Sequence, residues 1–343
     1  MINFRYHLVS ITAVIVALTV GIVLGVASVQ NGLVDQLRNQ LNGIKADVKN
    51  TDAIDAGLRK QLGDWNAFAK DAGPTLVADK LKDVPILLVA VQGINADPVS
   101  KGLTDTLKAA SRYEGTVWLT SKFSLDKAGD VKDLADMLGL PETAPPASLR
   151  LRAYTELTGA WTAVSTGATT TVPDTASTAT TAGPNATLGP KECAPKLLLS
   201  CLNTKGFVTL DGPDSSTPVS VAGGTRFVVV SGDGAKVSDD VGAISMVRAL
   251  LAASPSTLVV AVESVPEAVT NGSSKDPLAR ARFLGPLLTA GGDVMSRVST
   301  DDVIEDFKGQ VGTVLALSAL ATGAVGHYGV GPTADSLVPA LGS

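Results

Sequence analysis

An uninterrupted apolar run near the amino terminus constrains this chain more than any other feature. Residues 8–29 read LVSITAVIVALTVGIVLGVASV, twenty-two positions without a charge. Because a helix rises about 1.5 Å per residue, this run can cross a hydrocarbon core of roughly 30 Å. We therefore expect one membrane-spanning helix, followed by a water-soluble body.

The length and flanks of this run favour a retained anchor over a cleaved signal peptide or a buried core helix. A signal peptide has a shorter apolar region of about 7–15 residues, and Ala27-Ser28-Val29 is a poor cleavage site. Arg5 precedes the run and Asp35 is the first charge after it, which predicts a cytoplasmic amino terminus and an extracytoplasmic body. Gly21 and Gly25 form a small-xxx-small pair that lets two helices approach closely, although glycine is also common in membrane helices without that role.

A seven-residue repeat follows the anchor and predicts a helical stalk. Eight of the ten seam positions are apolar: Val34, Leu37, Leu41, Ile44, Val48, Thr51, Asp55, Leu58, Leu62 and Trp65. This pattern is typical of a coiled coil or of an amphipathic helix docked on its own protein. We expect a parallel stalk that ends at Gly73-Pro74.

The remaining chain alternates between apolar runs of strand length and amphipathic stretches of helix length. Strands are expected at 84–91, 116–120, 206–210, 226–231, 257–262 and 293–298, and helices at 98–113, 131–138, 148–164, 237–253, 276–290 and 309–322. Strand–helix–strand units with short connections predict a mostly parallel sheet. The fold class is therefore α/β: a single transmembrane helix, a coiled-coil-like stalk and a Rossmann/flavodoxin-like body.

The predicted organisation has six parts. Residues 165–190 contain almost no large apolar side chains and are expected to form a disordered Thr-rich insert. The anchor covers 1–29, the stalk 30–72, the two parts of the α/β body 73–164 and 191–330, and a flexible tail 331–343.

Composition limits the chemistry that the chain can perform. The net charge of −5 gives no basic surface for nucleic acid. Soft copper ligands are few, and Cys193, Cys201 and His327 are weak candidates among residues scattered along the chain. The two cysteines would lie about 12 Å apart along a continuous helix, so a disulfide requires a sharp turn between them.

No arrangement of residues predicts an enzyme. The turn 231–234, Ser-Gly-Asp-Gly, follows a strand at the place where α/β sheets bind ligands. It lacks the spacing of a dinucleotide or P-loop motif, and a tight backbone turn uses the same residues. We expect a structural turn, with a ligand-binding sensor as the alternative, and no cofactor.

Two stretches resemble the mycobacterial copper transport protein B family. The opening combines Arg5 and His7 with an apolar run that ends in Gly21 and Gly25. The closing part places Asp301-Asp302-Val303 before a Gly-rich apolar helix and the turn Gly326-His327-Tyr328-Gly329. The resemblance implies an actinobacterial envelope protein that forms an outer-membrane channel for copper, and it carries no established metal ligands with it.

These observations lead to one expected function and one alternative. We expect a membrane-anchored protein of copper efflux or tolerance, with copper as the transported ion. It would contact membrane lipid and assemble into a homo-oligomer through the anchor and the stalk. The alternative is a non-enzymatic scaffold whose stalk and body bind other envelope components.

Overall fold

The computed structural model describes residues 4–78, 80–94, 98–163, 169–171, 193, 197–214, 216–265, 281–289 and 294–339. The chain divides into two compact units, Met1–Ala67 and Phe68–Ser343. The first unit is helical, and the second contains the sheet and its covering helices.

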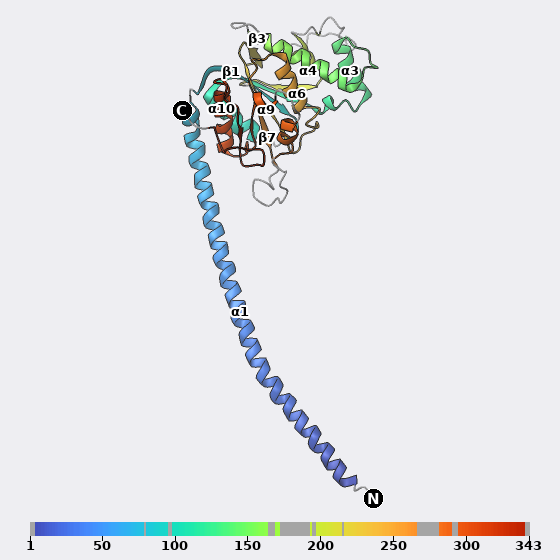
Figure 1. Ribbon diagram of the computed structural model, residues 1–343, viewed down its shortest axis with the longest axis vertical. Coiled ribbons are helices and arrows are strands. Elements are labelled where there is room, and N and C mark those ends of the chain that lie inside the picture. The colour runs from blue at the N-terminus through green and yellow to red at the C-terminus, as the bar shows by residue number, and fades with distance from the viewer. Residues whose placement is uncertain are drawn as a thin grey trace. The chain divides into compact units, whose positions relative to one another are not determined.

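One helix, α1 (Phe4–Val77), contains the predicted span and the predicted stalk without a break (Figure 1). The prediction that Gly73-Pro74 ends the stalk is wrong. Val77 is fully buried in the core of the second unit, and its burial favours one more helical turn. Gly73 serves packing, because a Cβ there would lie 1.9 Å from Cε2 of Phe307.

The second unit is built on a seven-stranded sheet in the order β4-β2-β1-β6-β7-β8-β9. Six strands pair in parallel: β1 (Leu81–Val91), β2 (Ser111–Leu119), β6 (Arg226–Gly232), β7 (Val259–Ser264), β8 (Val298–Asp301) and β9 (His327–Tyr328). The edge strand β4 (Val208–Asp211) is antiparallel. The predicted α/β class and mostly parallel sheet are confirmed, whereas the Rossmann/flavodoxin-like class stays a prediction.

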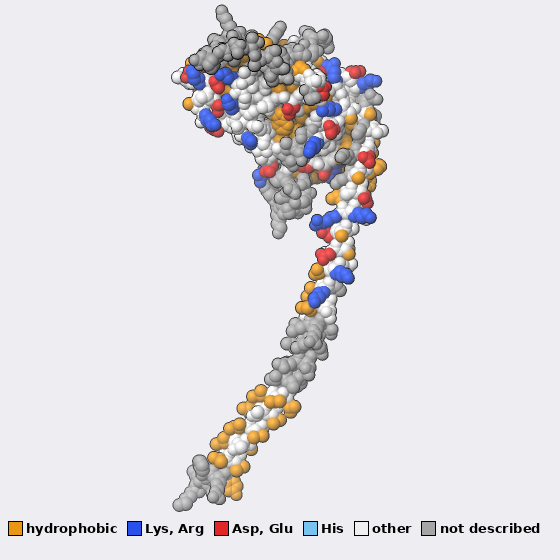
Figure 2. Space-filling view, turned by 180° about the vertical axis from the view of Figure 1, so that it is seen from behind, with side chains coloured by type: hydrophobic (Ala, Val, Ile, Leu, Met, Phe, Trp, Pro, Cys, Tyr) orange, Lys and Arg blue, Asp and Glu red, His pale blue; other side chains and the backbone are white. Residues whose placement is uncertain are grey.

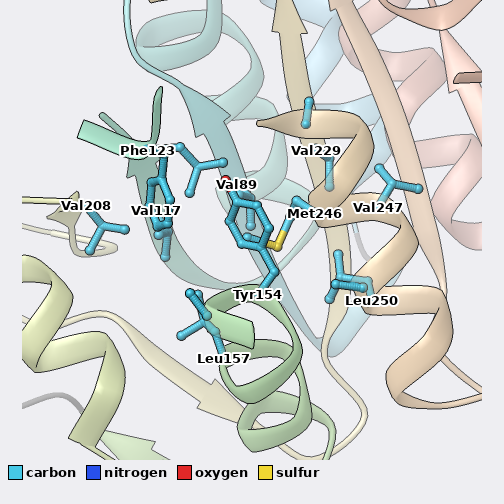
Figure 3. Close-up of a cluster of buried hydrophobic side chains, with 14 of the residues drawn as sticks. Val89, Val117, Phe123, Tyr154, Leu157, Val208, Val229, Met246, Val247 and Leu250 are labelled. Atoms are coloured by element: carbon cyan, nitrogen blue, oxygen red, sulfur yellow. The ribbon is translucent and has the colours of Figure 1, made fainter. Parts of the chain in front are cut away.

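Two apolar cores lie on opposite faces of this sheet, because successive strand side chains point to opposite faces. In β1, Leu87 and Val89 belong to one core and Ile86 and Leu88 to the other. The first core, part of which is drawn in Figure 3, includes residues of α3 (Ala128–Leu138), α4 (Pro146–Thr162), α5 (Leu198–Thr204), α6 (Ala243–Ala253) and α8 (Leu284–Thr289). The second includes residues of α2 (Thr104–Ala110), α10 (Phe307–Leu320) and the end of α1.

Several element boundaries differ from the predicted ones. The helix expected at 98–113 is a π-helical turn (Pro98–Leu103) followed by α2, and β2 begins directly afterwards. A short 3-10 helix, Ser121–Ser124, follows β2. The strand expected at 293–298 is instead helix α9 (Val294–Arg297), because β7 pairs with this segment only from Val298 onwards. The expected final helix is confirmed as α10.

Some described residues of the predicted insert and tail form backbone hydrogen bonds with the rest of the second unit. Thr169–Thr171 form β3, which pairs antiparallel with β5 (Ser220–Ala222). The other insert residues, and 276–280 of the helix predicted at 276–290, lie outside the described residues. In the tail, the Asp335 N–H donates to the His327 carbonyl at 2.7 Å, so the predicted tail begins attached to β9.

Candidate functional site

The apolar part of α1 is the first candidate site, since a helix of this kind could anchor the protein in a membrane. Residues Tyr6–Gly25 have a mean hydropathy of 2.6, and none of them is buried. Figure 2 shows apolar side chains around this part of the helix and charged ones farther along it. By length and composition the segment can cross a membrane.

Two hydroxyl groups of the span bind the backbone of their own helix. Thr12 Oγ1 donates to the Leu8 carbonyl at 2.8 Å, and Thr19 Oγ1 donates to the Ile15 carbonyl at 2.8 Å. A hydroxyl group that makes such a bond tolerates a lipid environment. Gly21 and Gly25 have open space where a Cβ would lie, so both leave room for a close approach.

Apolar side chains of the stalk are exposed along the predicted seam. The six described ones are 54–66% exposed: Leu41, Ile44, Val48, Leu58, Leu62 and Trp65. Asp55, which interrupts the seam, forms an ion pair at 3.1 Å with Arg59 one turn later. The helical part of the stalk prediction is confirmed, and its pairing into a coiled coil stays a prediction.

The two cysteines are joined in a disulfide. Cys193 precedes α5 and Cys201 lies within it, with their Cα atoms 6.0 Å apart. The helix begins at Leu198, so the chain turns between the cysteines and the bond coexists with a short helix. Neither sulfur is a thiolate in this state, and both cysteines line the first core.

His327 lies on β9, an edge strand of the seven-stranded sheet. It is buried in β9, and its Nδ1 is 3.1 Å from Thr300 Oγ1 of β8. The disulfide is carried by α5, which packs beside β4 at the opposite edge. Six strand spacings of about 4.8 Å separate these edges by roughly 29 Å. The structure therefore does not bring the three candidate copper ligands together.

Residues of the closing stretch meet at β8 and β9. The Asp302 carboxylate accepts the N–H groups of Val330 and Gly331 at 2.8 and 2.7 Å. Asp301 Oδ1 accepts the Val303 N–H at 3.0 Å, and its Oδ2 accepts the Thr313 hydroxyl of α10 at 3.4 Å. Burial raises the pKa of Asp301 well above its usual range. Both carboxylates thus fasten β8 to the segments that follow it.

Glu263 is a third buried carboxylate at this end of the sheet. Its oxygens accept the N–H groups of Arg282, Phe283 and Leu284 at 2.8, 3.2 and 3.1 Å. Burial outweighs these bonds and raises the pKa of Glu263 to about 7. Sequence reasoning missed all three roles, although a charged residue at the end of an apolar run, as in VVAVES, is a usable signal.

The turn at 231–234 lies where the strand order reverses, between β1 and β6. Here the Lys236 N–H donates to the Gln92 carbonyl at 2.7 Å, and the Asp233 N–H donates to the Ser264 carbonyl at 2.9 Å. A Cβ on Gly234 would lie 2.6 Å from the Gly93 carbonyl oxygen. The two turns therefore pack backbone against backbone, and these N–H groups are used within the protein, which supports the structural reading of the turn.

Among the residues that the structure describes, no group of three or more His, Cys, Asp or Glu side chains is arranged to hold a metal ion. The buried carboxylates act instead on backbone N–H groups. The described residues thus comprise a helix that is long and apolar enough to cross a membrane and an ordered α/β body.

Comparison with known proteins connects these features. A family model described as "Copper transport outer membrane protein, MctB" matches residues 1–339. The chain belongs to the MctB family. Relatives named "Copper transporter MctB" from Mycobacterium bovis and Mycobacterium tuberculosis are 27% identical over 344 residues, which is 98% of this chain and 99% of each relative. The resemblance seen in the sequence is confirmed.

The MctB relatives are named as transporters rather than enzymes, which is consistent with the expectation of a non-enzyme. The family description also includes the outer membrane. Family and relatives together indicate a copper transport protein of the MctB type.

Proposed function

We propose that this chain is a membrane-anchored envelope protein that acts in copper efflux or tolerance, with copper as its cargo. The observation that carries this proposal is the family match from residue 1 to 339. It includes the apolar part of α1 as well as the body, so the chain shares the family's whole arrangement.

The proposed location is an envelope membrane with a cytoplasmic amino terminus and an extracytoplasmic body. The Arg5 and Asp35 flanks support this orientation for an anchor in the inner membrane, whereas the family description names the outer membrane, in which the amino terminus would not face the cytoplasm. Envelope fractionation with protease protection tests both points. Digestion of the body in intact cells or spheroplasts is expected, and full protection of the body would reverse the orientation.

A copper path through the membrane would require several copies of α1. A single span offers few polar groups, and the Thr12 and Thr19 hydroxyl protons are bonded within their own helix. Cation paths in membranes are lined by polar or charged groups. The proposed channel is therefore an oligomer assembled through the anchor and the stalk.

Copper flux into lipid vesicles tests transport directly. Vesicles that contain the full chain are expected to show copper movement that protein-free vesicles lack. Thr12→Val and Thr19→Val together should reduce this flux if the hydroxyl oxygens face the path. The matched control is Thr155→Val on α4, whose hydroxyl donates to the Leu151 carbonyl at the same 2.8 Å but lies outside the span and the seam. If the full chain produces neither copper flux nor conductance in these vesicles, the proposal of transport is refuted.

The second candidate function is a scaffold whose stalk and body bind envelope components. It is favoured by the absence of a metal-binding group from the described part of the chain. A scaffold predicts that deletion of the protein alters copper tolerance in cells while purified protein moves no copper in vesicles.

A further inference from the structure

The exposed apolar seam of the stalk is large enough for a specific contact. Its six described side chains, from Leu41 to Trp65, are 54–66% exposed. Burying them on each of two copies would remove on the order of 1,000 Å² from water, the size of a small specific interface. Lipid cannot cover this part of α1, because charged residues accompany it, among them Lys45, Asp52 and Lys60.

The seam has a continuation in the membrane span because α1 is a single unbroken helix. Counting back in sevens from Leu41 gives Val34, Ala27, Val20 and Ala13, and counting back from Ile44 gives Leu37, Gln30, Val23, Val16 and Val9. Eight of these nine positions are apolar, and Gln30 is the one polar position. Gly21 and Gly25 fall outside this seam, at positions that point away from a partner paired along it.

The handedness of helix crossing separates the two faces of the span. A seven-residue repeat held over many turns imposes a left-handed supercoil, as in most membrane bundles. A glycine pair four residues apart is typical of right-handed crossings near −40°. Two copies joined along the stalk seam cannot change to that crossing without separating or bending α1.

We propose that a second copy of this chain lies parallel to the first along one seam from Val9 to Trp65, with Val16, Val20 and Val23 at the contact in the span. Copies anchored in one membrane by the same end are held parallel, and an in-register pair matches each seam residue with itself. This inference rests on the oligomer of the proposed function and names the face that forms it.

The pairing places one unfavourable layer in the stalk. Asp55 lies seven residues after Val48 on the seam, so it faces Asp55 of the second copy. Arg59 of the same helix, 3.1 Å from the Asp55 carboxylate, offsets part of this repulsion. Asp55 therefore weakens the pairing of the two copies. Removing its charge is expected to strengthen that pairing.

Single-cysteine crosslinking of the full chain in phospholipid vesicles tests the seam. The natural cysteines are already joined, so introduced thiols report on contacts between copies. Val16→Cys, Val23→Cys and Ile44→Cys are expected to form disulfide dimers on mild oxidation. Gly21→Cys and Gly25→Cys in the span, and Gly57→Cys in the stalk, are the off-seam controls and are expected to remain monomeric.

Dimers from Gly21→Cys and Gly25→Cys in place of Val16→Cys and Val23→Cys would overturn the continuous seam. An antiparallel contact, or one with a different protein, would leave Val23→Cys and Ile44→Cys monomeric and would also overturn it. Copper flux measured on the same vesicles separates the two proposals, because seam crosslinks without flux contradict transport alone.

A second measurement uses the Asp55 layer. Asp55→Asn is expected to tighten self-association by about tenfold, because it removes a like-charge contact from the interface. Asp64→Asn, which lies off the seam, removes the same charge and is expected to leave the association constant unchanged. Equal effects of the two variants would contradict the placement of Asp55 between the copies.

Discussion

The Tyr154 hydroxyl is buried in the first core without a hydrogen-bond partner, and Figure 3 shows the side chain projecting from α4 into that core. Burial raises its pKa above the usual range. Because an unsatisfied buried polar group costs about 1–3 kcal/mol, Tyr154→Phe is expected to raise the free energy of unfolding by about 1 kcal/mol. Urea unfolding followed by circular dichroism measures this change.

Tyr113→Phe is the matched control for that substitution. The Tyr113 hydroxyl is also buried, but it shares a hydrogen bond with Thr116 Oγ1. Its removal is expected to lower the unfolding free energy by about 1 kcal/mol. If both variants shift stability in the same direction, the satisfied and unsatisfied hydroxyl groups do not differ as the structure indicates.

Glu263 predicts a pH dependence of stability. Its pKa is about 7 in the folded protein and 4.5 in its ordinary environment, so the folded state holds the proton more tightly. The contribution of protonated Glu263 to the free energy of unfolding is fully present below about pH 4.5 and is lost as pH rises through about 7. This loss lowers the free energy of unfolding by roughly 3 kcal/mol at most. Glu263→Gln should flatten the stability curve between these pH values.

The control for Glu263 is an exposed carboxyl with the opposite shift. Hydrogen bonds from Ser216 and Thr217 lower the pKa of Asp214 to about 2. The contribution of Asp214 is present above pH 3.8 and is lost as pH falls through about 2, so Asp214→Asn should not alter the slope between pH 4.5 and 7. A curve that Glu263→Gln leaves unchanged would show that Glu263 does not titrate in that range.

At the scale of elements, the end of α1 packs closely against Phe307 because Gly73 has no side chain. A Cβ there would meet the Phe307 ring at 1.9 Å, so Gly73→Ala is expected to destabilise the body by about 1–3 kcal/mol through overpacking. Gly57→Ala has open space and is expected to stabilise the helix by about 0.5–1 kcal/mol. Thermal unfolding of both variants gives the comparison.

Rescue distinguishes this contact from a general effect of helix propensity. Phe307→Leu shortens the side chain that would clash and should recover stability only in combination with Gly73→Ala. Additive effects of the two substitutions would indicate that residues 73 and 307 do not touch.

The disulfide closes a short loop ahead of α5. Cys193 and Cys201 are separated by eight positions, and the double substitution to Ser is expected to cost about 2 kcal/mol of stability. Mass spectrometry without reductant should find the bond in the natural chain. A fully reduced pair, or no loss of melting temperature in the double variant, would contradict this stabilising role.

The sequence predicted most elements because their signals are local. VPILLVAV and TLVVAV read as buried strands; β1 contains the first, and β7 contains the second from Val259 onwards. It failed at Gly73-Pro74 and at 293–298, where distant partners decide the outcome. Gly73 is required by its contact with Phe307, and β8 begins at Val298 because that residue pairs with Val259 of β7. Neither contact can be predicted from the residues next to Gly73 or Val298 in the sequence.

At the scale of the whole molecule, the family could be predicted from the sequence. The positions of its two closing motifs relative to each other in the fold could not. Asp302 and the turn around His327 were recognised as separate motifs, and the structure joins them through N–H groups of Val330 and Gly331. Cys193, Cys201 and His327 were grouped by residue type alone. Only the strand order places the cysteines and the histidine at opposite edges.

The strand order also determines when the body can become ordered during synthesis. β1 pairs with β6, so Val89 finds Val229 only after the intervening 139 residues have been made. Closing such a long loop is slow, and a sheet dominated by distant pairings forms late. His327 and Tyr328 then complete the far edge. The chain therefore emerges almost entirely before its sheet can close, which is compatible with the extracytoplasmic body proposed above.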